Sequence, residues 1–386
     1  MPSEHARFSP SSFERLIRCP ASLKMQEGIQ DSSTEYSRTG TSAHRLCEHK
    51  LLERLGREDA LNVEELEGYD EAMERNAEEY ASYVWECYQN ALARNGSAVL
   101  HVEHRVCIPG VGKDGDCFGT GDAILFTDGM VHVFDYKNGV TPVESEENAQ
   151  LMAYAYGAVN ELGLVWGCEE VNLTIFQPNI SNTSTWGTTW EHVDGWFNGV
   201  LVPATREAVG KNPHGEPGDH CKFCKAKARC GFIAEMAHEV AVREFCSPDR
   251  LIDMDEVGHF LGVAKTLKDW IGSLEAWALD KALKGEKVPG WKVVEGKSNR
   301  SWSDEGKAAE AVKALGFEPY RAPELKTLTD IERMVGKKQT KAWEKEGLLV
   351  KPQGKPTLAL ETDERAEFVP AVADFSDELK NQKENT

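Results

Sequence analysis

The spacing of apolar side chains predicts several helices. Between residues 71 and 93, apolar positions recur every three or four residues and therefore share one helix face. They are Tyr80, Val84, Cys87, Tyr88 and Ala91. Similar patterns predict helices over 40–55, 147–162, 193–209 and 254–283. A short first helix, capped by Ser11 or Ser12, is expected to end before Pro20.

Short runs of β-branched and aromatic residues predict five strands. They cover 99–106, 118–126, 131–136, 171–177 and 186–191. The second and third strands are joined by Thr127-Asp128-Gly129, which is typical of a hairpin turn. The resulting order, α-α-β-β-β-α-β-β-α, indicates an α/β fold in which helices flank a mixed sheet.

The pattern changes after residue 250. A turn and strand are expected over 285–296 and short helices over 305–315 and 328–338, and the last residues are polar. A chain of 386 residues is long enough for two or three domains. We therefore expect one domain over 1–245 and an accessory α+β domain over 246–386 that ends in a frayed tail.

Acidic residues outnumber basic ones and give the chain a net charge of −20. This charge argues against a protein that coats nucleic acid through a basic surface. Residues 1–250 carry 22 basic and 39 acidic side chains, whereas 265–355 carry 19 basic and 14 acidic ones. The distribution suits an enzyme that binds a metal in its first part and contacts phosphates with a later one, although a solvated acidic surface also explains it.

Neither a membrane-spanning segment nor a secretory signal is visible in the sequence. No apolar run reaches the roughly 18 residues that a transmembrane helix requires. The first residues, Met1-Pro2-Ser3-Glu4-His5, lack a basic region followed by an apolar stretch. These observations predict a cytoplasmic protein.

Candidate chemistry lies in two neighbouring predicted strands. Asp122 is in one, and Asp135 and Lys137 are at the end of the next. Two carboxylates at the ends of paired strands repel each other unless a cation lies between them, and hard oxygen ligands suit Mg²⁺ or Mn²⁺. Lys137 follows Asp135 by two residues, shares its sheet face, and could steady charge on a phosphate. Turn aspartates and a surface lysine are the simpler alternative.

Two further features favour a site at these strands. Gln150 and Tyr154 are four residues apart in a predicted helix and therefore share one face. His44, just after Gly40 in an earlier predicted helix, could supply a nitrogen ligand to the same metal. Taken alone, each is better explained by a structural role: His44 as a satisfied helix residue, and Gln150 and Tyr154 as a polar pair where a helix meets the sheet.

The order of these motifs resembles the RecB-type branch of the PD-(D/E)xK nuclease superfamily. The motifs fall at Gly40/His44, Gly119/Asp122, Asp135/Lys137 and Gln150/Tyr154. The resemblance implies a restriction-endonuclease-like sheet in which His44, Asp122 and Asp135 hold a divalent metal and Lys137 assists catalysis. It also implies that the helix of Gln150 and Tyr154 contacts DNA near the cut. Glu103, on the first strand, resembles an acidic position found in the same family.

The ten cysteines are distributed unevenly. Without a secretory signal, they are expected to be reduced thiols or metal ligands. Three cluster at Cys221, Cys224 and Cys230, and Cys19 lies far upstream before a proline. The six others are interpreted as small buried side chains. They are Cys47, Cys87, Cys107, Cys117, Cys168 and Cys246.

One upstream cysteine followed by Cys-x2-Cys-x5-Cys resembles the iron–sulfur nucleases of this group, such as the CRISPR-associated RecB-type exonucleases and the AddB nuclease domain. The resemblance implies a [4Fe–4S] cluster held by Cys19, Cys221, Cys224 and Cys230. Such a cluster would close a loop of about 200 residues, and the stabilisation from loop closure grows with loop length. A zinc site of four cysteines, or of three cysteines and His220, is the alternative.

The segment that includes Lys292, Lys297 and Arg300 resembles a family of phage-encoded RecB-like proteins thought to serve phage recombination. Together with Trp291 and Trp302, these cations could bind a DNA strand. Buried tryptophans with solvated basic residues, or an oligomer contact, are equally consistent with the segment.

These features together predict a Mg²⁺- or Mn²⁺-dependent DNA exonuclease with a structural [4Fe–4S] cluster. We expect it to act in phage recombination, replication or repair, in the host cytoplasm, with a phage single-strand-binding or annealing protein and homo-oligomers as candidate partners. The rival hypothesis is a non-catalytic DNA-binding or assembly protein that keeps the nuclease fold.

Overall fold

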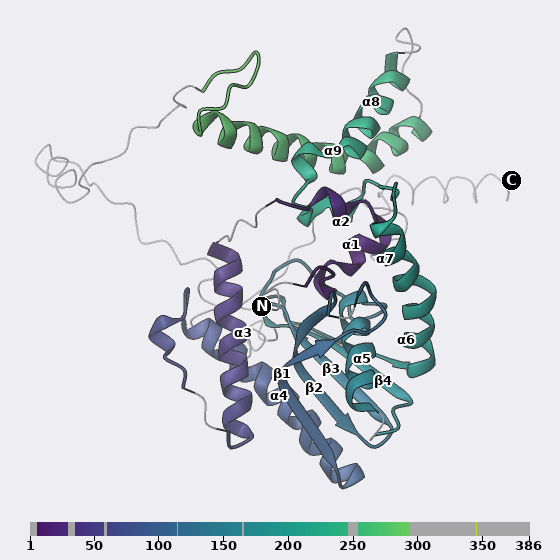
Figure 1. Ribbon diagram of the computed structural model, residues 1–386. Helices are drawn as coiled ribbons and strands as arrows, with labels where there is room; N and C mark the ends of the chain where they lie inside the picture. The colour runs from purple at the N-terminus through teal and green to yellow at the C-terminus, as the bar shows by residue number, and fades with distance from the viewer. Residues whose placement is uncertain are drawn as a thin grey trace, which may run out of the picture. The chain divides into compact units, whose positions relative to one another are not determined.

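The computed structural model describes residues 6–29, 35–57, 60–113, 115–163, 166–245, 254–293 and 345. The chain divides into two compact units, residues 1–297 and 298–386. The helices and strands given below all belong to the first unit (Figure 1). None of the helices in the described ranges combines the length and the apolar character that crossing a bilayer requires.

A five-stranded mixed sheet forms the centre of the first unit. Its strands are β1 (Ala98–Cys107), β2 (Phe118–Thr127), β3 (Met130–Tyr136), β4 (Glu170–Gln177) and β5 (Asn182–Thr189). They lie in chain order across the sheet, and every neighbouring pair is antiparallel except β3 and β4. The parallel pair is connected through helix α5 (Ala149–Leu162). The predicted α/β fold with a mixed sheet is therefore confirmed.

Helices cover the sheet and bury its apolar side chains in two clusters. Helices α3 (Glu35–Arg54) and α4 (Glu71–Asn95) pack against each other and contribute Leu46, Leu51 and Tyr80 to one cluster. Helix α5 contributes to the other cluster, where the N-terminal segment also packs. Since strand side chains alternate between faces, β3 supplies Phe134 to the first cluster and Val133 to the second.

Segments from the start of the chain and from after β5 contact α5 and one another. At the start of the chain these are a short turn (Pro10–Ser12), α1 (Phe13–Arg18) and α2 (Ser22–Met25). After β5 come α6 (Trp190–Trp196), a π-helical segment (Phe197–Leu201) and α7 (Val202–Val209). Two 3-10 turns (Asp219–Phe223 and Lys227–Arg229) then carry the clustered cysteines, and α8 (Gly231–Phe245) and α9 (Met254–Leu283) follow.

Some predicted boundaries were wrong. Helix α3 begins at Glu35 and not at Gly40, and β5 begins at Asn182, four residues before the predicted strand. The helix predicted over 193–209 begins at Trp190, where Thr189 caps it, and is interrupted by the π-helical segment. Cys107, predicted to be buried, is exposed.

Other predictions lie wholly or partly outside the described residues. No strand forms within 285–293, and 294–296 are not described. The helices predicted over 305–315 and 328–338 also lie outside the described residues. The predicted domain boundary after residue 245 falls at the start of 246–253, which is not described either, and so stays a prediction.

Candidate functional site

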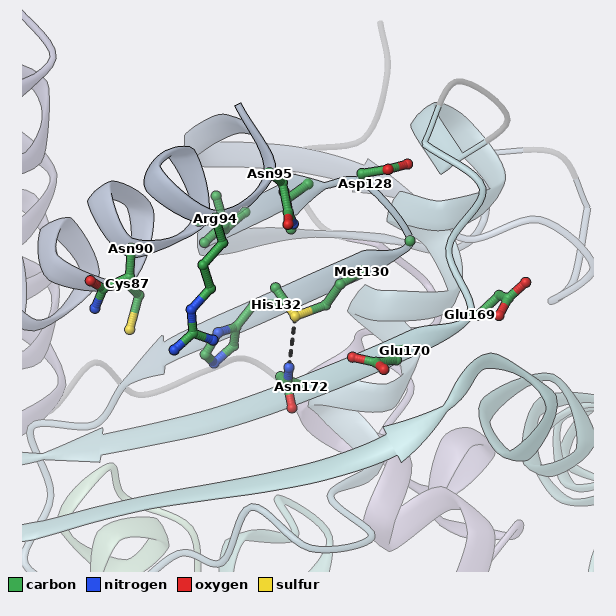
Figure 2. Close-up of a pocket in the computed structure, with 14 residues that line it drawn as sticks. Cys87, Asn90, Arg94, Asn95, Asp128, Met130, His132, Glu169, Glu170 and Asn172 are labelled. Carbon is green, nitrogen blue, oxygen red and sulfur yellow. Dashed lines mark hydrogen bonds between the residues drawn. The ribbon is translucent and has the colours of Figure 1, made fainter. Parts of the chain in front are cut away.

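A pocket of about 540 Å³ lies at the end of the sheet next to the C-terminus of α4. It lies between the last turns of α4 and the first residues of β3 and β4 (Figure 2). His132, which lines it, is buried with its Nε2 2.7 Å from Thr174 Oγ1, and Asn172 Nδ2 donates to Met130 Sδ over 2.9 Å. None of the side chains that line it belongs to the predicted site.

The predicted acidic residues lie farther along β2 and β3. Ala123 pairs with Phe134 across these antiparallel strands, so Asp122 and Asp135 are the next positions in the register. Asp122 Oδ2 accepts the backbone N–H of Tyr136 over 2.7 Å. The two strands are therefore hairpin neighbours, as predicted, and both aspartates are close to the same point of the sheet.

Helix α3 brings His44 to Asp122. The Nδ1 atom of His44 lies 3.1 Å from Asp122 Oδ1, and the His44 ring stands edge-on to Tyr136 at 5.4 Å. Burial disfavours the charged ring, but the charge of Asp122 and its hydrogen bond outweigh burial and raise the pKa of His44 to about 9. The same partnership lowers the pKa of Asp122 despite its burial.

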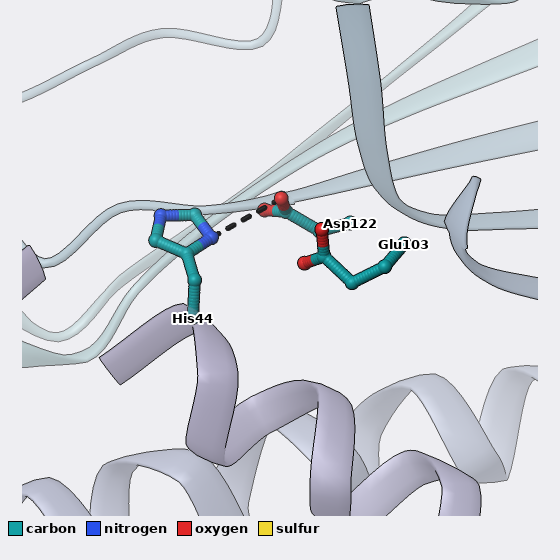
Figure 3. Close-up of side chains that lie close together, drawn as sticks. All are labelled: His44, Glu103 and Asp122. Atoms are coloured by element: carbon teal, nitrogen blue, oxygen red, sulfur yellow. Dashed lines mark hydrogen bonds and ion pairs between the residues drawn. The ribbon is translucent and has the colours of Figure 1, made fainter. Parts of the chain in front are cut away.

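Glu103 on β1 completes a group of three possible ligands. Val102 pairs with Ala123 and His104 with Gly121, which places Glu103 opposite Asp122. One ligand atom from each of His44, Glu103 and Asp122 lies within 4.8 Å of the others (Figure 3). Asp135, the third ligand predicted from sequence, is not a member of this group. The sequence signal for Glu103 was only the acidic position in Val-Glu-His.

Two features mark Glu103 as unusual for a strand residue. Its φ is 46°, in the left-handed region that residues other than glycine rarely adopt. Burial, followed by repulsion from Asp122, raises the pKa of its carboxyl to about 8. The backbone of Glu103 is thus strained, and its carboxylate is destabilised. With the imidazole of His44 and the carboxylate of Asp122, it forms a donor set that fits a divalent cation.

Asp135 is held by two other side chains. Its Oδ2 forms an ion pair with Lys137 Nζ at 2.8 Å, and its Oδ1 accepts from Gln150 Nε2 over 3.1 Å. Lys137 Nζ also donates to Gln150 Oε1 over 3.0 Å. Burial, together with the charge of Asp122, raises the pKa of Asp135 against the opposing effect of Lys137. Burial opposes the charge on Lys137, but Asp135 outweighs it and raises the pKa of the ammonium.

Tyr154 contacts Gln150 and leaves no space for a side chain at Gly119. Tyr154 is only 6% exposed, and its hydroxyl is 3.5 Å from Gln150 Nε2. A Cβ atom on Gly119 would lie 2.7 Å from Tyr154 Cε1, closer than side chains pack. Gln150 therefore holds Asp135 and Lys137 in place, and Tyr154 in turn contacts Gln150. The DNA contact implied for Gln150 and Tyr154 stays a prediction.

All four predicted iron–sulfur cysteines line one small cavity. Cys19 reaches it from the end of α1, and Cys221, Cys224 and Cys230 reach it from the two 3-10 turns. Ile233 of α8 and Trp270 of α9 belong to the apolar cluster around Cys221 and Cys230. His220 lines the same cavity, and its Nε2 is 2.8 Å from the carbonyl oxygen of Glu216. Residues separated by about 200 positions thus meet there.

Comparisons with known proteins place the chain in a family. The family described as "Protein of unknown function (DUF2800)" matches residues 5–366. The chain belongs to this DUF2800 family. A solved structure titled "Crystal structure of SSO0001" is similar at 16% identity and a TM-score of 0.21, and the match covers 48% of the DUF2800 chain and 95% of that chain.

The DNA-binding residues predicted late in the DUF2800 chain are described only in part. Lys292 is exposed, and the neighbouring Trp291 is 81% exposed rather than part of a core. Lys297, Arg300 and Trp302 lie outside the described residues. The structure brings the residues of the acidic site together at one place and the four cysteines together at another. DNA binding by the later basic segment stays a prediction.

Proposed function

We propose that this DUF2800 protein is a Mg²⁺- or Mn²⁺-dependent deoxyribonuclease. The observation that carries the proposal is the group of one imidazole nitrogen and two carboxylates within 4.8 Å. We assign the metal to His44, Glu103 and Asp122, with Asp135 as a further acid beside it. In this assignment Glu103 takes the place of Asp135 among the three ligands expected from sequence.

The bound metal would act as a Lewis acid on a phosphate oxygen and lower the pKa of an attacking water. The chain's own contribution is orientation. Asp135 and Gln150 hold Lys137 Nζ at 2.8 and 3.0 Å, and the ammonium stays charged because its pKa is raised. A fixed cation at this position can orient the nucleophile and stabilise the charge that grows on a phosphate.

We further propose that the enzyme removes nucleotides from DNA ends, in phage recombination, replication or repair. The motif order supports this expectation, and the net charge of −20 is more compatible with local contacts at a strand end than with binding along a long duplex.

We assign the four cysteines to a [4Fe–4S] cluster. All four line one cavity, and a [4Fe–4S] cluster binds one thiolate at each of its four irons. The resemblance of the Cys-x2-Cys-x5-Cys motif to the iron–sulfur nucleases supports this assignment over a zinc site. The cluster would join the start of the chain to the end of the sheet domain.

The nuclease proposal is tested with end-labelled linear DNA and anaerobically purified protein. Asp122→Asn and Lys137→Met are each expected to lower Mg²⁺- or Mn²⁺-dependent nucleotide release by about 100-fold or more, because metal and fixed charges supply several kcal/mol of transition-state stabilisation. Asp128→Asn, in the exposed turn between β2 and β3, is the matched control.

The same samples separate catalysis from scaffolding. Mn²⁺ at 100 times its Kd should raise the unfolding free energy of the unaltered protein by about 2.7 kcal/mol, and Asp122→Asn should abolish the increase. A protein that neither binds Mn²⁺ in this way nor releases nucleotides would be a scaffold, and the proposal would be wrong.

A further inference from the structure

The turns that carry the cysteines are strongly basic within an acidic chain. Four basic residues and no acidic residue lie between Cys221 and Cys230, whereas the whole chain has a net charge of −20. The basic residues are Lys222, Lys225, Lys227 and Arg229. A local concentration of positive charge of this kind is complementary to a polyanion.

An aromatic side chain projects from the same turns. Phe223 is 74% exposed, although it lies between Cys221 and Cys224, which both face the cavity. Arg15 Nη1 donates to the carbonyl oxygen of Phe223 over 3.3 Å, and Lys222 Nζ lies 5.1 Å from the centre of its ring. Arg15 of α1 and the buried Cys221 thus hold the backbone, while the ring faces solvent next to a cation.

The basic turn touches the segment that leads out of the candidate active site. Lys222 Nζ donates to Thr141 Oγ1 over 3.2 Å. Thr141 follows Lys137 by four residues, and four residues of extended chain span at most about 14 Å. Next to Thr141, Val140 is 65% exposed. Two exposed apolar side chains, Phe223 and Val140, are therefore next in sequence to the two residues of the Lys222–Thr141 hydrogen bond. This hydrogen bond lies a few residues along the chain from Lys137.

The segment over 138–143, which follows Lys137, is fixed by hydrogen bonds to Gln177. Gln177 Nε2, at the end of β4, donates to the carbonyl oxygens of Gly139 and Thr141, each over 2.7 Å. Gln177 Oε1 accepts the backbone N–H of Val143 over 3.2 Å. Val140 is therefore presented on a held backbone, and Phe223 faces solvent beside it.

We propose that Phe223 stacks on an unpaired base and, with Lys222 and Val140, guides a single DNA strand to the acidic site. The inference rests on the proposed nuclease function and names its substrate as a single-stranded DNA end. A base in a duplex hides its faces against its neighbours, whereas an unpaired base can stack on an aromatic ring. The acid-free run of cations favours a polyanion over a protein partner.

The test is fluorescence anisotropy with a labelled single-stranded oligonucleotide and a blunt duplex of equal length, without added divalent metal. Phe223→Ala is expected to weaken single-strand binding about 5- to 100-fold and to leave duplex binding unchanged. Phe223→Tyr should retain binding. Phe223→Leu should bind as weakly as Phe223→Ala, because leucine keeps apolar volume but has no ring to stack on a base. Lys222→Gln should reduce the slope of log affinity against log salt by about 0.7.

Val200→Ala is the matched control, because Val200 is also an exposed apolar residue (41%) but lies between α6 and α7. Thermal melts and the recovery of binding in Phe223→Tyr show that the fold is intact. Unchanged single-strand affinity in Phe223→Ala would overturn the inference. A changed oligomeric state without a change in affinity would also overturn it and would assign the ring to a second copy of the chain.

The outcomes separate this inference from the nuclease proposal. If the unaltered protein cleaves DNA and Phe223→Ala binds single strands normally, only the role of Phe223 fails. If Phe223-dependent binding is measured but no metal-dependent cleavage occurs, the strand-binding surface stands and the nuclease proposal fails.

Discussion

Substituting Gly119 tests whether Tyr154 is fixed behind the candidate site. Side chains in ordinary contact lie 3.4–4 Å apart, but a Cβ on Gly119 would be 2.7 Å from Tyr154 Cε1, 2.9 Å from its Oη and 3.1 Å from Pro10 Cγ. Tyr154 must therefore move by at least about 0.7 Å, and a buried ring cannot do so freely. We expect Gly119→Ala to lower the free energy of unfolding by about 1–3 kcal/mol, the usual cost of overpacking.

Urea unfolding of Gly119→Ala, Tyr154→Leu, their double variant and Gly40→Ala measures this effect. Tyr154→Leu removes both clashing atoms, so adding Gly119→Ala to it should cost at least about 1 kcal/mol less than adding it to the unaltered protein. Gly40→Ala is the matched control, because no atom lies within 4 Å of a Cβ built there. Since Gly40 is inside helix α3, alanine should stabilise by about 0.5–1 kcal/mol.

Equal effects of Gly119→Ala and Gly40→Ala on the free energy of unfolding would show that Tyr154 does not exclude a side chain at Gly119. An unchanged cost of Gly119→Ala in the Tyr154→Leu background would show the same.

Two further predictions concern protonation and the cysteines. Burial lowers the pKa of His132 to about 3 from 6.5, so protons bind the unfolded chain preferentially and stability falls as pH drops between these values. Relative to pH 7.5, unfolding at pH 5.5 should cost about 1.4 kcal/mol less through this group, and His132→Gln should remove that part of the pH dependence in urea melts; equal pH dependence in both proteins would contradict this. Cys19→Ser should purify anaerobically without iron and melt like the chelator-stripped protein, whereas Cys107→Ser, at an exposed thiol, should keep its iron. Full iron content in Cys19→Ser would remove Cys19 from the ligand set.

Local sequence signals predicted much of the fold. Helix α4 follows from its apolar stripe, and its ends follow from chemistry: Asp70 caps it by accepting from Met73 N, and Gly96 ends it at φ 71°. The convergence of Asp122 and Asp135 could be predicted because their strands are joined by a two-residue turn, which fixes the register.

Other features depend on contacts that local sequence does not encode. Strand β5 is polar, and its side chains are alternately half-buried and exposed, so pairing with β4 rather than apolar periodicity sets its start at Asn182. The left-handed backbone of Glu103 arises where β1 passes Asp122, and no local pattern announces it. The sequence therefore indicated an acidic site but not which carboxylates share one point.

The path of the first 25 residues has a consequence for biosynthesis. Phe8 forms a bridge to Cys117, Ala21 N donates to the carbonyl oxygen of His214, and Cys19 meets Cys230 in one cavity. These residues are synthesised before their partners, and they meet the last of them only when residue 230 has emerged. At 5–20 residues per second, that wait is roughly 10 to 50 s. During this interval the apolar side chains of Phe8 and Phe13 lack their final surroundings and expose surface that can associate with other chains.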